Sequence, residues 1–129
     1  MCINPDEIEK HITKKTSAIL GVHVYGFPCQ VEKIQKIADK YGLKVLYDGA
    51  HVFSTEINGE GIGNFGDITM FSFHATKLFN TIEGGCLSYK DEALKRKIYN
   101  LRNFGIRSEE VVEDIGINGK MNEIQAVIG

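Results

Sequence analysis

The sequence has few cysteines, no excess of charge of one sign and no long apolar run. Its three cysteines are odd in number, far apart and in no CxxC pair, which disfavours a disulfide framework or a zinc site and favours reduced thiols in the cytoplasm. The formal net charge of -2 gives no reason to expect nucleic acid or an anionic membrane as a partner. The longest apolar run is far too short for a membrane span, and the first residues lack the pattern of a signal peptide. These absences predict a soluble, cytoplasmic globular protein.

The composition is that of such a protein. The chain has 129 residues, of which 43% are hydrophobic and 25% are charged, enough to build one core. The last eight residues, 122–129, begin an amphipathic helix at which the sequence stops. Since a domain seldom ends where a helix has just begun, we expect a truncated product.

The first half of the chain has the pattern of a strand, a helix and a second strand. Residues 17–25 and 43–47 are apolar runs typical of buried strands. Between them, apolar residues recur at helical spacing over residues 31–41, and Gly42 stands where a C-terminal cap belongs. This order predicts a parallel βαβ unit with a right-handed crossover, and hence an α/β fold. A short helix over residues 6–15, capped by Asn4 or Asp6, is expected before it.

Further elements follow. We predict a hairpin turn at Asn58-Gly59, a third strand over residues 67–73, an irregular segment over 74–82, a short strand over 86–89 and a helix over 91–103 capped by Asp91.

Three side chains could converge at one edge of the predicted sheet. Asp48 lies just past the second strand, at the edge where open α/β sheets bind ligands. Ser72 ends the third strand, and Lys77 follows on a loop that can bring its amine to the same edge. Each has an ordinary alternative: a turn aspartate, a serine that satisfies backbone groups and a solvated surface lysine.

Together these groups match what pyridoxal-phosphate (PLP) chemistry requires. A lysine amine forms an imine with the PLP aldehyde, a carboxylate keeps the pyridine nitrogen protonated, and hydrogen-bond donors hold the phosphate. Other chemistries fit less well. Residues 61–66 match GxGxxG but precede a strand instead of following one, so a dinucleotide fingerprint is rejected. The four histidines have no metal-ligand spacing.

Three runs resemble the cofactor segments of the DegT/DnrJ/EryC1/StrS sugar aminotransferases: YDGAH at residues 47–51, FSFHATK at 71–77 and EGG at 83–85. The flanking residues 12–26, 100–105 and 116–126 are also similar to that family, so the resemblance covers essentially the whole chain in order.

This resemblance implies part of the large domain of a fold-type-I PLP enzyme, with a mostly parallel sheet, acting as a homodimer. By position, Lys77 would be the Schiff-base lysine and Asp48 the partner of the pyridinium. His51 would lie near the ring hydroxyl, and Ser72 would bind the phosphate. Asn118 falls near a segment that reaches the cofactor of the partner subunit, although the following Gly119 and Lys120 depart from the family pattern.

The resemblance also implies an activity. Such enzymes transfer an amino group, usually from L-glutamate, to a keto group of a nucleotide-linked deoxysugar, in deoxyamino sugar and polysaccharide biosynthesis. Lys77 would serve as general base and acid. The family's N-terminal segment and C-terminal small domain have no counterpart in residues 1–129. We therefore expect the chain alone to bind PLP weakly and to turn over little.

Two alternatives remain at this point. One is a PLP-family dehydratase or regulatory member; related dehydratases carry histidine in place of the lysine, so Lys77 favours transamination. The other is a non-catalytic βαβ module that binds nucleotides or another protein.

Overall fold

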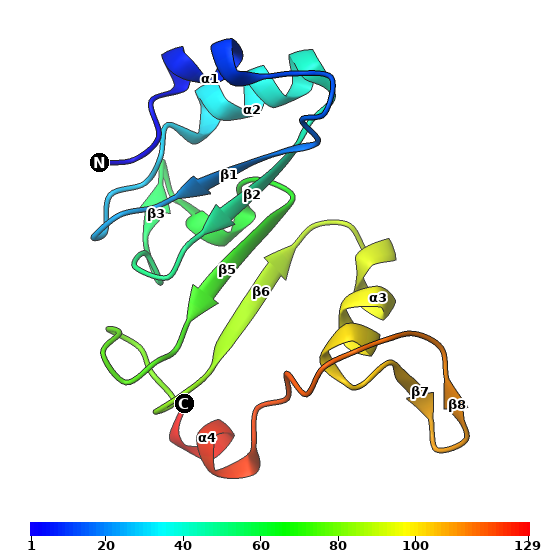
Figure 1. The fold of residues 1–129 in the computed structure, drawn as a ribbon. Coiled ribbons are helices and arrows are strands. Elements are labelled where there is room, and N and C mark those ends of the chain that lie inside the picture. The colour runs from blue at the N-terminus through cyan, green and yellow to red at the C-terminus, as the bar shows by residue number, and fades with distance from the viewer. The chain divides into compact units, whose positions relative to one another are not determined.

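The computed structural model describes residues 1–129, which form two compact units, Met1–Lys90 and Asp91–Gly129 (Figure 1). No helix combines the length and the apolar character that a membrane span requires.

A four-stranded sheet forms the centre of the first unit. Its order is β1-β2-β5-β6, with bounds Ala18–Val22, Lys44–Asp48, Ile68–Ser72 and Gly85–Tyr89. The first three strands are parallel and β6 is antiparallel to β5. The predicted α/β class with a mostly parallel sheet is therefore confirmed.

Of the two helices in this unit, one has the predicted bounds and the other ends earlier than predicted. Helix α1 (Pro5–His11) is shorter than predicted, and its N-cap is Asn4, whose side chain accepts a hydrogen bond from the Asp6 amide at 3.2 Å. Helix α2 (Val31–Tyr41) connects β1 to β2 and ends at Gly42, which has the left-handed conformation of a C-cap. The parallel βαβ unit is thus present as predicted.

The core lies on one face of this sheet. Along β1, β2 and β5 every second residue is buried, and the strand register aligns these residues across the sheet. Ile34 and Ala38 of α2 and Val52 and Ile62 of the segment after β2 are also buried, and α2 contacts β2. The other face is more open, and Leu20 there is 64% exposed. In Figure 1, α1 and α2 lie together on one side of the sheet.

The segment between β2 and β5 contains a small hairpin and one helical turn. Strands β3 (Glu56–Ile57) and β4 (Glu60–Gly61) are antiparallel and joined by Asn58 and Gly59, both with positive φ, as predicted for this turn. The 3-10 helix η1 (Ile62–Asn64) then leads into β5. The GxGxxG match therefore precedes a strand and opens no α-helix.

The second unit contains two helices and a hairpin. Helix α3 (Ala93–Arg102) lies within the predicted range, and the Asp91 carboxylate accepts a hydrogen bond from the Ala93 amide at 2.9 Å. Strands β7 (Ile106–Ser108) and β8 (Val111–Val112) form a hairpin that the sequence pattern did not predict. Helix α4 (Glu123–Ile128) begins at Asn122 with a capping box that includes Gln125.

Candidate functional site

The carboxyl ends of β2 and β5 form the edge at which the predicted residues lie. Asp48 is the last residue of β2, not one past it as predicted, and Ser72 is the last residue of β5. Asp48 is aligned with Met70, two residues before Ser72, so the side chains of Asp48 and Ser72 emerge on the same face of the sheet. His51 follows β2 by three residues, and Lys77 lies in the turn after β5. The structure thus brings four predicted site residues to one edge.

The Asp48 carboxylate is fixed through one of its oxygens. Its Oδ1 accepts a hydrogen bond from the Ala50 amide at 2.9 Å, and its main-chain oxygen accepts one from the His23 amide at 3.0 Å. The next residue, Gly49, donates to the Met70 carbonyl at 2.7 Å, and a Cβ at Gly49 would lie 2.8 Å from that oxygen. Glycine is therefore required for this close approach. Oδ2 of Asp48 has no protein partner and can bind another group.

Lys77 lies on a loop whose two ends are joined by backbone hydrogen bonds. The Phe73 amide donates to Gly84 at 2.8 Å, and the Thr81 amide donates to Phe73 at 3.0 Å. The Lys77 amide donates to the carbonyl of His74 at 2.9 Å. The side chain of Lys77 is half-buried, and its ammonium forms neither an ion pair nor a hydrogen bond. The backbone of the loop that carries Lys77 is therefore fixed, and its amine remains without an ion-pair partner.

Four phenylalanines, one of them on this loop, form a cluster of ring contacts. Phe79, on the loop, stacks on Phe53 with ring centroids 4.9 Å apart and meets Phe73 edge-on at 4.9 Å. Phe53 also contacts Phe71 and Phe73 edge-on. Offset and edge-on aromatic pairs of this kind stabilise a packing arrangement beyond their buried area. The loop that carries Lys77 is thus anchored to the core.

His51 contacts Tyr25, and Ser72 forms a hydrogen bond within its own turn. The ring of His51 stacks on Tyr25 at 5.3 Å, and its Nδ1 lies 3.5 Å from the Tyr25 amide. Ser72 Oγ accepts a hydrogen bond from the His74 amide at 3.3 Å, which leaves its hydroxyl proton free to donate. Like Asp48 and Lys77, both residues retain a polar atom with no protein partner.

A buried polar cluster lies behind Asp48. The ring of His23 is only 1% exposed, stacks on Tyr47 at 4.6 Å and accepts a hydrogen bond from the Cys29 amide at 2.9 Å through Nδ1. Burial lowers the pKa of His23, and the negative charge of Asp48 opposes this shift. Burial also raises the pKa of Tyr47, so its phenol stays protonated. His23 is therefore neutral near pH 7, which leaves the Asp48 carboxylate without a cationic partner from this cluster.

Asn118 belongs to the second unit. It forms an isolated bridge with Asn103, and its side-chain oxygen accepts a hydrogen bond from the Lys120 amide at 3.4 Å. Its role toward a cofactor stays a prediction, as do the roles of the four residues in the first unit.

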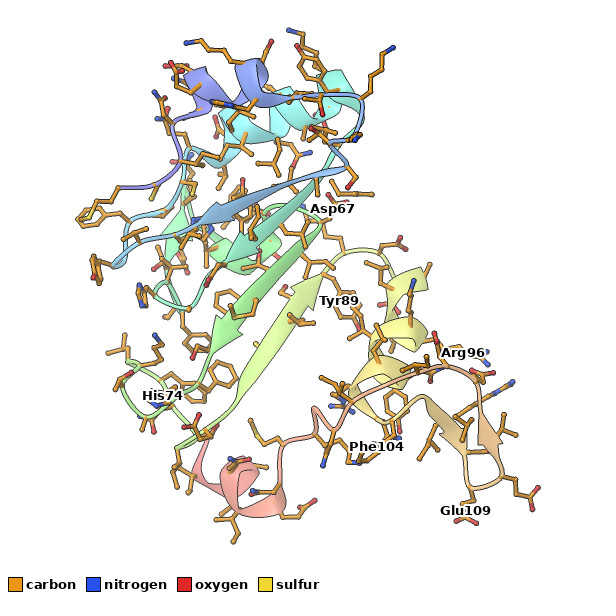
Figure 2. All side chains as sticks on the ribbon, in the orientation of Figure 1. Asp67, His74, Tyr89, Arg96, Phe104 and Glu109 are labelled. Carbon is orange, nitrogen blue, oxygen red and sulfur yellow. The ribbon has the colours of Figure 1, made fainter.

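Sequence reasoning missed three residues that contact the predicted ones. Tyr25 packs on His51, His74 contacts the turn that holds Lys77, and His23 binds the main chain of Asp48 (Figure 2 labels His74). The signal available for Tyr25 and His23 was their place at the carboxyl end of β1, the same edge that Asp48 occupies. For His74 it was the short spacing to Lys77.

Comparisons with known proteins identify relatives in sequence and in fold. A dTDP-4-amino-4,6-dideoxy-D-glucose transaminase from Shigella dysenteriae is 47% identical over 122 residues, which are 95% of this chain and 33% of that protein. The solved structure of PseC from Helicobacter pylori, an aminotransferase of pseudoaminic acid biosynthesis, is 34% identical with a TM-score of 0.94, and the match covers 98% of this chain and 35% of PseC. NtdA from Bacillus subtilis, solved with bound cofactor PMP, is 33% identical with a TM-score of 0.88, and the match covers 98% of this chain and 29% of NtdA.

The chain thus spans about a third of the length of these relatives. The family model of the DegT/DnrJ/EryC1/StrS aminotransferases matches residues 1–129. Because this match covers the whole chain and the fold agrees with a solved aminotransferase, the chain belongs to the DegT/DnrJ/EryC1/StrS aminotransferase family.

Proposed function

We propose that this chain is the cofactor-holding part of a PLP-dependent aminotransferase that transfers an amino group, from L-glutamate, to a nucleotide-linked keto-deoxysugar. Family membership supports the reaction class. The Shigella relative is named for a dTDP-linked amino sugar, which supports the substrate class, and the Bacillus relative holds PMP, the aminated form of PLP. The observation that carries the proposal is the gathering of Asp48, Ser72 and Lys77 at one sheet edge.

The residues at this edge fit the cofactor. PLP offers an aldehyde, a pyridine nitrogen, a ring hydroxyl and a phosphate, and each needs a different partner. The atoms without protein partners are of the matching kinds: the Lys77 amine, Asp48 Oδ2, a ring nitrogen of His51 and the Ser72 hydroxyl. We assign Lys77 to the aldehyde, Asp48 to the ring nitrogen, His51 to the ring hydroxyl and Ser72 to the phosphate. Asn118 would lie in a segment that reaches the cofactor of the partner subunit. When bound, PLP supplies an electron sink for the substrate carbanion.

The chain's own groups have two tasks in this reaction. Asp48, anchored through Oδ1, presents Oδ2 as a fixed negative charge that keeps a neighbouring ring nitrogen protonated. Lys77, whose amine forms no ion pair, would take a proton from a substrate carbon and return it to another atom as general base and acid. The Phe53 and Phe79 rings anchor the loop that carries Lys77, which limits how far its backbone can move.

The setting of the site is part of the proposal. Residues 1–129 would form part of the large PLP-binding domain of a homodimeric, cytoplasmic enzyme. An N-terminal segment and a C-terminal small domain would supply the remaining phosphate contacts and much of the sugar surface. The chain's coverage of about a third of its relatives supports this assignment. We accordingly expect weak PLP binding and little turnover from the 129-residue chain by itself.

Covalent trapping tests the proposal without requiring turnover. The purified chain is incubated with PLP, reduced with borohydride and digested, and the labelled peptides are identified by mass spectrometry. We expect Lys77 to be labelled faster than any other lysine, and Asp48→Asn to slow this labelling. Label spread over the exposed lysines, or absent from Lys77, would contradict the proposal.

Two variants control this experiment. Lys77→Arg keeps the charge but should abolish the fast labelling, since a guanidinium forms no comparable adduct. Lys36→Arg, on the exposed side of α2, should leave the labelling of Lys77 unchanged. If both variants lost the fast labelling to a similar extent, the label would reflect general lysine reactivity and not a binding site.

A further inference from the structure

His74, labelled in Figure 2, contacts several parts of the loop that carries Lys77. Its ring Nδ1 lies 3.2 Å from the Thr76 amide and 2.9 Å from the Thr76 hydroxyl. Its Nε2 lies 3.4 Å from a carboxylate oxygen of Glu83, and its main-chain oxygen accepts the Lys77 amide at 2.9 Å. One residue thus contacts the start, the turn and the far end of the loop.

The first of these contacts fixes the ring's tautomer. A backbone N–H can only donate, so Nδ1 of His74 must present its lone pair to the Thr76 amide. In the neutral ring the proton therefore resides on Nε2, from which it points at the Glu83 carboxylate. The Thr76 hydroxyl, at 2.9 Å, then also faces Nδ1 as a donor. All three contacts are consistent with a single protonation state.

We propose that His74 is a positioning residue for Lys77, acting through the acceptor at Nδ1, which holds the turn of residues 74–77 in shape. The inference rests on the proposed function of Lys77. The Thr76 contact lies inside this turn, one residue from Lys77, and replaces the local hydrogen bond that an asparagine or aspartate would supply in such a turn. The Glu83 contact is a solvent-exposed hydrogen bond from the neutral ring and contributes less, because solvent competes for it.

Two substitutions separate the two ring nitrogens. Asparagine places a carbonyl oxygen near the position of Nδ1 and can accept from the Thr76 amide, but it cannot reach Glu83. Glutamine places a donor near the position of Nε2 and can reach Glu83, but it offers no acceptor at the position of Nδ1 for the Thr76 amide. His74→Asn is therefore the conservative variant for positioning, and His74→Gln is its matched control. The His74 side chain is 46% exposed, so neither change opens the core.

The ring's tautomer can be read without any cofactor. In the chain with nitrogen-15-labelled histidine, NMR at about pH 8, above the ordinary histidine pKa, reports which ring nitrogen carries the proton. We expect Nε2–H at His74, with the signals assigned by their loss in His74→Asn. His11, an exposed histidine at the end of α1, serves as the reference for an unconstrained ring. A proton on Nδ1 of His74, or a tautomer mixture like that of His11, overturns the proposal.

Labelling of Lys77 with PLP and borohydride gives the second readout. Since one hydrogen bond is at stake, we expect His74→Gln and His74→Ala to slow labelling about fivefold, and His74→Asn to stay near the wild-type rate. Circular dichroism should show unchanged folding in all three variants. Equal rates in the Asn and Gln variants, or rescue by Gln alone, overturn the positioning role. Failure of the unsubstituted chain to label at Lys77 instead overturns the proposed function, and the positioning role with it.

Discussion

Each of the two units of this chain is stabilised internally by a different kind of interaction. The first unit has a core of apolar side chains that includes Ile34 and Val45, both fully buried. Every buried hydrophobic side chain of the protein lies in this unit, before residue 91. In the second unit the buried side chain is that of Asn100, and large apolar residues such as Ile117 are exposed. Apolar burial therefore stabilises the unit with the candidate catalytic edge, and polar contacts stabilise the other.

The polar contacts of the second unit meet at one carboxylate. Glu113 follows strand β8, and its oxygens accept hydrogen bonds from Arg96, Asn100 and Arg107. Arg96 and Asn100 come from α3 and Arg107 from β7, so this carboxylate joins the hairpin to the helix. The Arg96 guanidinium, followed by the Asn100 amide, lowers the pKa of Glu113. The stability of this cluster depends on charge, so a substitution that removes the charge can test it without changing the apolar core of the first unit.

The largest expected effect is on the apolar core. Ile34→Ala removes a fully buried side chain from the contact between α2 and the sheet and should lower the free energy of unfolding by about 2–5 kcal/mol. Ile117→Ala, the matched change at an exposed position of the second unit, should stay within about 0.5 kcal/mol. Urea unfolding followed by circular dichroism measures both. Similar losses in the two variants would show that the contrast between the units is wrong.

A smaller effect is expected from neutralising the carboxylate cluster. Glu113→Gln keeps the size of the side chain but removes the charge that Arg96 and Arg107 face. Hydrogen exchange should become severalfold faster at the hairpin amides, including that of Glu113, which donates to Gly105. The amides of β2 and β5 should exchange as before. Glu109→Gln, at the exposed tip between β7 and β8, is the control and should change neither set of amides.

The same contrast explains what the sequence could predict. Strands β1, β2 and β5 and helix α2 were predicted because burial imposes a regular spacing of apolar residues, and the Asn58-Gly59 turn has a local signal. The hairpin of β7 and β8 has very short strands and depends on Glu113 meeting residues of α3, so no period in the sequence indicates it. The edge carrying Asp48 was predicted because parallel topology fixes where strands end. The contacts of Tyr25 and His74 depend on loop conformation, which topology does not fix.

Acid should weaken the two units in different pH ranges. His23 is neutral and buried in the first unit, with its pKa below the ordinary 6.5, so the folded state binds the proton less well than the unfolded state. The stabilisation is complete above pH 6.5 and is lost as the pH falls from there toward the lower folded-state pKa. Glu113 also has a lowered pKa, so its contribution to the second unit is complete above its ordinary 4.5 and declines only below that value.

On acidification, therefore, the first unit should lose stability before the second does. Hydrogen exchange measured at steps from pH 7 downward should speed up at the slowest amides of β2 before the contacts of Glu113 weaken, once intrinsic exchange rates are corrected for pH. His23→Asn keeps an acceptor for the Cys29 amide but does not titrate. It should therefore reduce the acid-induced rise in exchange at the β2 amides and leave the weakening of the Glu113 contacts unchanged. His11→Asn, at an exposed position, should alter neither. If β2 instead kept its protection until the second unit had opened, burial of His23 would have no thermodynamic cost, and the contrast would rest on apolar packing alone.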